Sequence, residues 1–188
     1  MYRVHLPGRS TNPAWRDAAR RLASHRILAE KVEWTRELAG TGLFGFDPLP
    51  ANDGAYEVTA SKALIDLTGA VLCHSDPQAP ALAYRLLLRH QYDRRALSNP
   101  ADPLTQRLRR MEKSVRRDIH KMHAFVRFRE LPTEGLRRSF AAWFEPQHFI
   151  TERAAGFFAV RFADMDWLIA TPDMTVTFRD GVLGFGPA

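Results

Sequence analysis

Two short stretches of the 188-residue chain combine residue types that could do chemistry on a polyanion. The stretch 116–129 places arginines and a lysine beside histidines and phenylalanines, and the stretch 143–148 reads Trp-Phe-Glu-Pro-Gln-His. Cations hold phosphates, and aromatic rings can stack on bases. A histidine three residues from a carboxylate can serve as an acid or a base. The two stretches therefore indicate nucleic-acid binding, with hydrolysis as an alternative.

The binding interpretation assigns phosphate contacts to the cations and base contacts to the aromatic rings. Phe125, Arg127 and Arg129 alternate along an expected strand, so that the ring and the two cations would share one face. In the alternative structural interpretation, Phe125 belongs to the core and the arginines pair with Glu130 or Glu145. The expected nucleic-acid-binding residues are Arg109, Lys113, Arg116, Arg117, Lys121, Phe125, Arg127, Arg129, Trp143, Tyr84 and Arg85.

The enzyme interpretation uses His148 or His120 as the acid or base, oriented by Glu145. Arg127 or Arg129 would stabilise a developing anion during hydrolysis of a phosphodiester or a glycosidic bond. The residues alone leave open whether the chain is an enzyme. A third interpretation is a protein-interaction domain whose basic face docks an acidic partner.

Positive charge is concentrated in one part of the chain. There are 27 Lys and Arg against 21 Asp and Glu, a net charge of +6. Residues 101–130 hold nine of these cations and four acids, and so carry +5 of that total. A basic face on one element is typical of a surface that binds a polyanion, and also of a solvated helix face.

Several classes of protein are disfavoured by the sequence. The single cysteine, Cys73, excludes an intrachain disulfide, and no set of histidines and acids has the spacing of a zinc site. No nucleotide-binding glycine motif is present, so we expect neither a metal nor a cofactor. The longest runs without Asp, Glu, Lys or Arg, 38–46 and 67–75, are too short to span a bilayer. We expect a cytoplasmic protein with no membrane contact.

The N-terminal half is predicted to be a strand, a helix and a strand, followed by helices. Alternation predicts strands at 2–6 and 32–37, and Thr11 and Asn12 before Pro13 predict the start of the helix between them. The glycine- and proline-rich stretch from 39 to 54 is expected to be a loop. A brief extended run at 56–59, a helix capped by Ser61 and a helix over 81–89 should follow.

The clearest helix begins at Asp102-Pro103 and carries an apolar stripe from Leu104 to Met122, with the cations on its other faces. Period-two alternation then predicts strands at 124–129 and 137–144 around a turn at 133–135. A helix over 151–162 and three terminal strands, at 167–170, 176–179 and 182–185, complete the chain. We therefore expect an α+β fold with helices on a small, mainly antiparallel sheet, a C-terminal hairpin and short terminal strands.

We expect one domain over 1–188. Its lobe 1–54 would hold the strand-helix-strand unit and the loop, and its lobe 55–188 would hold the helical segment and the C-terminal sheet.

Several motifs together resemble the "DNA metabolism protein" family. They are Cys73-His74-x-Asp76-Pro77, Tyr84-Arg85-Leu86-Leu87, Arg116 to Met122, Phe125 to Arg129, Trp143-Phe144-Glu145-Pro146-x-His148, Phe157-Phe158, Arg161-Phe162, Trp167 and Thr171-Pro172-Asp173. The domain of that family also occurs as the N-terminal fusion partner of X-type uracil-DNA glycosylase-like proteins. The resemblance extends over essentially the whole chain.

The resemblance implies a role in DNA repair or DNA modification, with DNA as the ligand. It further implies partnership with a uracil-DNA glycosylase-like domain or with a radical-chemistry repair or modification protein. The sequence ends at Ala188, where the fused relatives continue into the glycosylase domain, so the uracil chemistry of that domain is not carried over to residues of this chain. The leading hypothesis is a DNA-binding accessory module.

Overall fold

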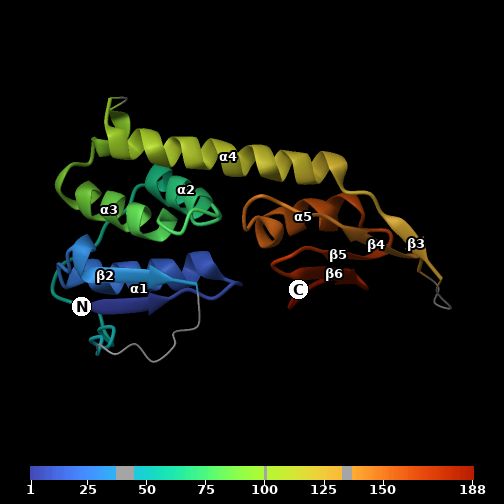
Figure 1. The fold of residues 1–188 in the computed structure, drawn as a ribbon, viewed down its shortest axis with the longest axis horizontal. Coiled ribbons are helices and arrows are strands. Elements are labelled where there is room, and N and C mark those ends of the chain that lie inside the picture. The colour runs from blue at the N-terminus through green and yellow to red at the C-terminus, as the bar shows by residue number, and fades with distance from the viewer. Residues whose placement is uncertain (37–44, 100, 133–136) are drawn as a thin grey trace. The chain divides into compact units, whose positions relative to one another are not determined.

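The computed structural model describes residues 1–36, 45–99, 101–132 and 137–188, and they form two compact units, Met1–Lys113 and Ser114–Ala188 (Figure 1). The predicted turn at 133–135 and the first part of the predicted loop from residue 39 lie outside the described residues. The expected division near residue 54 falls inside the first unit. The predicted α+β class is confirmed, because five α-helices occur with two separate sheets in the described part of the chain.

The first unit begins with a small parallel sheet. Strands β1 and β2 pair in register from Tyr2 opposite Val32 to His5 opposite Thr35, and the helix α1 joins them. Parallel strands require such a crossover, which confirms the predicted strand-helix-strand order. The elements of this unit are β1 (Tyr2–His5), α1 (Thr11–Ser24), the short 3-10 helix η1 (Ala29–Lys31), β2 (Val32–Thr35), α2 (Lys62–Val71), α3 (Ala79–Tyr92), the 3-10 helix η2 (Ala96–Ser98) and the first part of α4 (Pro103–Phe125).

Three aromatic side chains join α1, β2 and α3 in the core of this unit. The rings of Trp15 and Trp34 lie 5.8 Å apart, and those of Trp34 and Tyr84 lie 5.6 Å apart. The Tyr84 hydroxyl donates to the carbonyl oxygen of Ile27 at 2.7 Å, and the side chain is fully buried. Tyr84 therefore holds the fold together, and its prediction as a nucleic-acid-binding residue is wrong.

Two of the three predicted helix N-termini agree with the structure. Ser61 accepts a hydrogen bond from the Leu64 main-chain N–H, as predicted for the cap of α2. Asp102 accepts from the Thr105 N–H at 2.8 Å and starts α4, also as predicted. At α1 the prediction is wrong. The flanking residue is Ser10, with φ 56°, and the Thr11 hydroxyl donates to the Pro7 carbonyl and so does not cap the helix.

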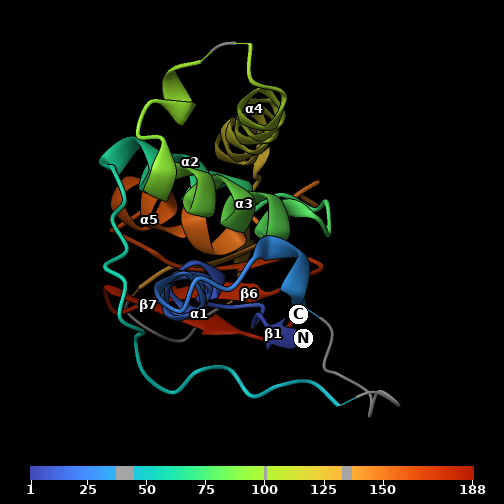
Figure 2. The same cartoon turned by 90° about the vertical axis from the view of Figure 1, so that its left-hand side faces the viewer.

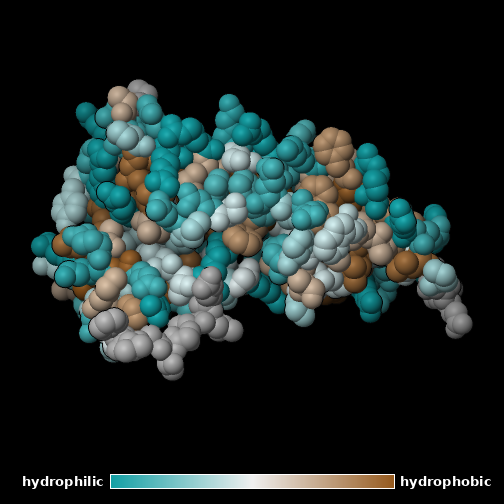
Figure 3. Space-filling model, viewed as in Figure 1, coloured by the Kyte–Doolittle hydropathy of each residue, from teal (hydrophilic) through white to brown (hydrophobic). Residues whose placement is uncertain are grey.

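The long helix α4 carries the predicted separation of apolar and basic faces. Leu108, Met111, Val115 and Met122 are buried. The cations on the other positions are exposed, and the surface along α4 is hydrophilic in Figure 3. They are Arg109, Arg110, Lys113, Arg116, Arg117 and Lys121.

The end of α4 differs from the prediction. We expected a strand over 124–129, but α4 continues to Phe125 and strand β3 covers only Arg129–Leu131. The apolar helical spacing continues from Met122 to Val126, whose N–H donates to the Met122 carbonyl oxygen. Extending an existing helix adds one hydrogen bond for each residue fixed, which outweighs a short alternating pattern. The shared strand face of Phe125, Arg127 and Arg129 therefore does not exist.

The second unit is a five-stranded sheet with one helix on it. The strand order is β3-β4-β5-β6-β7, antiparallel except for the parallel pair β4 and β5, which α5 connects. Figures 1 and 2 show α5 on one side of the strands. The elements are the last part of α4, β3 (Arg129–Leu131), β4 (Ser139–Trp143), α5 (Thr151–Arg161), β5 (Asp166–Ala170), β6 (Thr175–Arg179) and β7 (Val182–Gly186).

None of the helices in the described residues combines the length and the apolar character that a membrane span requires.

Buried histidines predict that acid destabilises the protein. Burial, followed by the charge of Arg94, lowers the pKa of His90, which is 1% exposed. A lowered folded-state pKa means that the unfolded chain binds more protons, so stability is present above an unfolded pKa of about 6.5 and is lost as pH falls below it. We expect the melting temperature to decrease when the pH is lowered from 7 to 5.5. The decrease should be smaller in His90→Leu. An equal loss in both proteins would contradict the assignment to His90.

Candidate nucleic-acid interface

The five-stranded sheet has one face packed against α5. Trp167 and Phe178 on neighbouring strands stack with their ring centroids 5.5 Å apart, and Phe158 of α5 lies over Trp167. These three side chains are buried. In the same unit, the C-terminal part of α4 packs on α5, where His123 stacks on Phe157 at 3.9 Å. Neither helix covers the other side of the sheet.

The opposite face carries an exposed tryptophan and an exposed arginine. Trp143 is paired with Ala170, and Ala141, two residues earlier in β4, is paired with Arg129 of β3. Since side chains alternate along a strand, Arg129 and Trp143 project from the same face and are diagonal neighbours, within reach of each other for long side chains. Trp143 is 62% exposed. The antiparallel pairing of β3 and β4 confirms the expected hairpin pairing, although its first strand is Arg129–Leu131 and not 124–129. The pairing makes two of the predicted binding residues diagonal neighbours.

The predicted cations divide into those with internal partners and those without. Arg109 donates to the Leu97 carbonyl oxygen at 3.0 Å, and Arg127 donates at 2.8 Å to the Ala124 carbonyl oxygen in the last turn of α4. These two guanidinium groups have structural roles. Within the described residues, the other predicted cations are exposed and have no ion pair or hydrogen-bond partner: Arg85, Lys113, Arg116, Arg117, Lys121 and Arg129.

The predicted ring Phe125 ends α4 instead of occupying a strand, and it is 62% exposed. Figure 3 shows hydrophobic groups at the surface near this end of the helix, among hydrophilic neighbours. Phe125 thus remains accessible, although not for the reason the sequence suggested. Arg85, Arg109 and Lys113 belong to the first unit, and the remaining predicted residues apart from Tyr84 belong to the second.

His148 lies in a buried polar contact between α4 and the segment after β4. Its ring Nε2 shares a 2.9 Å hydrogen bond with the Ser114 hydroxyl, and its main-chain N–H donates to Asp118 at 2.9 Å. Burial lowers the pKa of His148, while the Asp118 charge opposes this shift. The imidazole is therefore held neutral near pH 7, the form in which it can accept a proton.

The other two predicted catalytic residues do not join His148 in a catalytic arrangement. Glu145 and His120 are exposed, and the hydrogen bonds and ion pairs among the described residues include neither side chain. The carboxylate beside His148 is Asp118, which binds the main chain and so fixes the position of the segment. The expected orientation of His148 by Glu145 is not seen.

Ser114 and Asp118 were missed by sequence reasoning, although Asp118 left a signal. It lies three residues after Val115 and four before Met122, which is the spacing of the buried stripe on α4. A carboxylate at core spacing needs a hydrogen-bond partner, and the His148 N–H supplies one. Ser114, one turn before Asp118, had no comparable signal.

No group of three or more histidine, cysteine or acidic side chains that could hold a metal ion occurs in the described residues.

Fold and site together define an α+β protein whose second unit exposes an aromatic and cationic sheet face. The model of a family described as a domain of unknown function, DUF4130, matches residues 77–180, which is more than half of the chain. The chain belongs to this family. The match runs from the start of α3 to the end of β6 and therefore includes the sheet face and His148.

Neither the curated proteins nor the solved structures contain a match to this chain.

The buried contact at His148 yields a stability prediction. Asp118→Ala removes the acceptor for a buried N–H and should lower the free energy of unfolding by about 1–3 kcal/mol. Asp118→Asn keeps an oxygen acceptor and should lose less. Urea unfolding of the two variants beside the parent protein measures the difference. If Asp118→Ala were as stable as the parent, the hydrogen bond would contribute nothing.

Proposed function

We propose that this protein is a DNA-binding accessory module of DNA repair or DNA modification in the cytoplasm, and that the sheet face bearing Arg129 and Trp143 receives a single strand. The observation that carries the proposal is the pairing of β3 with β4. It brings an unpaired guanidinium group and an exposed indole ring together on a face that neither helix of the second unit covers. A ring beside a cation on an open sheet suits a base and its phosphate.

The basic face of α4 supports the same function through charge. Arg116, Arg117 and Lys121 lie in the second unit, and the described part of the chain offers them no acid partner. Exposed cations of this kind retain their full charge for phosphates, because no internal carboxylate neutralises them. Each phosphate that they neutralise releases counterions, which makes binding depend on salt.

The assignment to DNA metabolism is supported by the family resemblance of the sequence. That resemblance favours DNA over RNA and a partner that performs the chemistry, such as a glycosylase-like domain or a radical-chemistry protein. The proposed division of roles is that this chain holds the strand and the partner reacts with it.

The proposal predicts two separable effects on binding of a fluorescent single-stranded oligonucleotide. Trp143→Ala should weaken affinity at all salt concentrations by about tenfold, since one stacked base is worth about 1–3 kcal/mol. The double variant Arg116→Gln with Arg117→Gln should weaken affinity mainly at low salt. It should also reduce the slope of log affinity against log salt by about 0.7 for each lost contact.

Arg138→Gln is the matched control for these variants. Arg138 is an exposed arginine next to β4, but its Nε and Nη2 donate to the two carboxylate oxygens of Glu130, at 2.7 and 2.8 Å. Its loss should change affinity less than the loss of Arg129 in Arg129→Gln. Equal effects of the two changes, or no detectable DNA binding at low salt, would overturn the proposed sheet interface.

A second candidate function, phosphodiester hydrolysis, is favoured by the hydrogen bond between Ser114 and His148. A neutral imidazole Nε2 could take the hydroxyl proton as Ser114 Oγ attacks phosphorus, and then return that proton to the leaving oxygen. Water would hydrolyse the resulting phosphoserine. This chemistry replaces the Glu145 arrangement expected from the sequence.

The hydrolysis candidate predicts strand cleavage that is lost in Ser114→Ala. Incubated oligonucleotides would be separated on a denaturing gel, with Asp118→Asn as a variant that leaves the Ser114 hydroxyl and the His148 ring in place. Intact DNA with the parent protein, or equal cleavage by Ser114→Ala, would eliminate this candidate and leave the binding proposal standing.

A further inference from the structure

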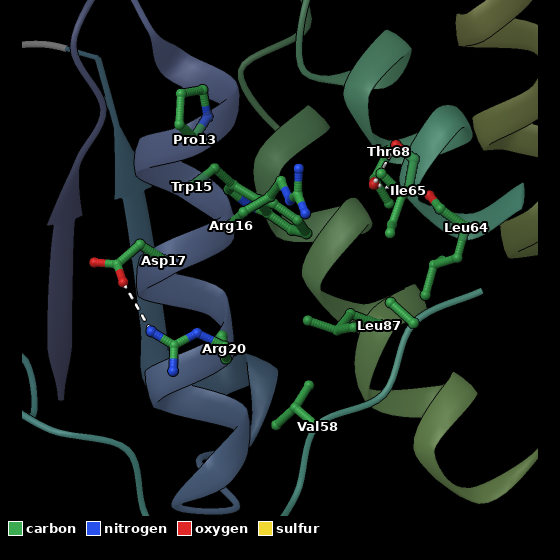
Figure 4. A pocket seen from close by; sticks show the side chains of 11 residues that line it. Pro13, Trp15, Arg16, Asp17, Arg20, Val58, Leu64, Ile65, Thr68 and Leu87 are labelled. Atoms are coloured by element: carbon green, nitrogen blue, oxygen red, sulfur yellow. Dashed lines mark hydrogen bonds and ion pairs between the residues drawn. The ribbon is translucent and has the colours of Figure 1, made fainter. Parts of the chain in front are cut away.

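A cavity of about 390 Å³ opens between α1, α2 and α3 of the first unit. Its wall is largely apolar: Trp15, Leu64 and Leu87 are buried there, and Val58 and Ile65 are half-buried. Figure 4 shows Trp15 projecting from α1 toward the side chains of α2 and α3. The size and lining fall within the range of sites for small molecules.

The polar atoms of the wall are already satisfied by the protein. The Trp15 Nε1–H donates to the Pro80 carbonyl oxygen at 3.1 Å, and the Thr68 hydroxyl donates to the Leu64 carbonyl oxygen at 2.8 Å. The wall therefore presents ring and methyl groups to a ligand, and these two polar groups do not need a hydrogen bond from it. An apolar molecular body suits this part of the cavity.

Two of the charged side chains at the rim of the cavity, Arg20 and Asp17, are compensated by neighbouring charges. Arg20 binds Asp17 at 3.1 Å and also pairs with Asp53, so its charge is compensated. Asp17 is held by Arg21 as well, and the hydrogen bond from Arg21, followed by that from Arg20, keeps the pKa of the Asp17 carboxyl below its usual value despite some opposing desolvation.

Arg16 differs from these neighbours. It lines the same cavity, and in the part of the chain that the structure describes it has no hydrogen bond or ion pair. Figure 4 shows its guanidinium group reaching from α1 into the space that faces α2, whereas Asp17 projects away from it. A guanidinium group beside an apolar wall is a binding point for a carboxylate or a phosphate, because its donors match two oxygens.

We propose that this cavity binds a small amphipathic anion, with its apolar body against Trp15, Leu64 and Leu87 and its acidic group on Arg16. The apolar wall contributes affinity through burial, and Arg16 selects an anion over a neutral molecule of the same shape. The site lies entirely in the first unit and is separate from the proposed DNA interface.

The test compares three probes of one shape by isothermal titration calorimetry on the full chain: 2-naphthoate, 2-naphthyl phosphate and the neutral 2-naphthylmethanol. At least one anion should bind about tenfold or more tightly than the alcohol, which is the scale of one charge-assisted hydrogen bond. The preferred anion distinguishes carboxylate from phosphate ligands. Equal binding of all three probes, or no binding of either anion at millimolar concentration, would overturn the proposal.

Two variants and one control tie the preference to the cavity. Arg16→Gln should abolish the preference for the anions while leaving the affinity of the alcohol unchanged. Ile65→Trp should fill the half-open space and weaken all three probes. Arg85→Gln removes an exposed arginine of α3 that does not line the cavity, and it should leave the affinities of the three probes unchanged. An unchanged preference in Arg16→Gln would refute the role of Arg16.

Discussion

The parallel pairing of β4 with β5 is the constraint on which the second unit depends. Two parallel neighbours cannot be joined by a tight turn, so the chain must cross from the end of one strand to the start of the other. Helix α5 makes that crossing over one face, where it buries Phe158 against Trp167. With a single crossover there is a single crossover helix, and no helix of this unit covers the other face of the sheet.

This asymmetry explains why the exposed residues of the sheet differ in kind from the buried ones. On the α5 side, Trp167 and Phe178 are enclosed in a continuous aromatic cluster. On the other side, Trp143 keeps more than half of its surface in contact with solvent. An indole ring that the fold leaves exposed is free to stack on another molecule.

Most of the elements could be predicted from the sequence, because their signals are local. The basic and apolar faces of α4 follow from helical spacing, and the terminal strands follow from alternation beside Asp180-Gly181. The prediction failed at Phe125, where two patterns overlap. The alternation of residues 124–129 indicated a strand, but the helix α4 continues to Phe125. The role of Tyr84 was also beyond sequence reasoning, because it depends on the carbonyl group of Ile27, which only the folded chain brings near. The contact of Ser114 with His148 joins residues 34 positions apart, and no spacing rule connects them.

The order of the strands in the second sheet also governs how it can form. Each strand pairs with the one that precedes or follows it in the chain, from β3 through β7, so no strand has to be inserted between two that already exist. Sequential pairing keeps the closed loops short, and short loops limit the entropy lost before contacts form. The strand order therefore allows the sheet to be built by successive additions from β3 outward, with the α5 crossover as the longest connection between its strands.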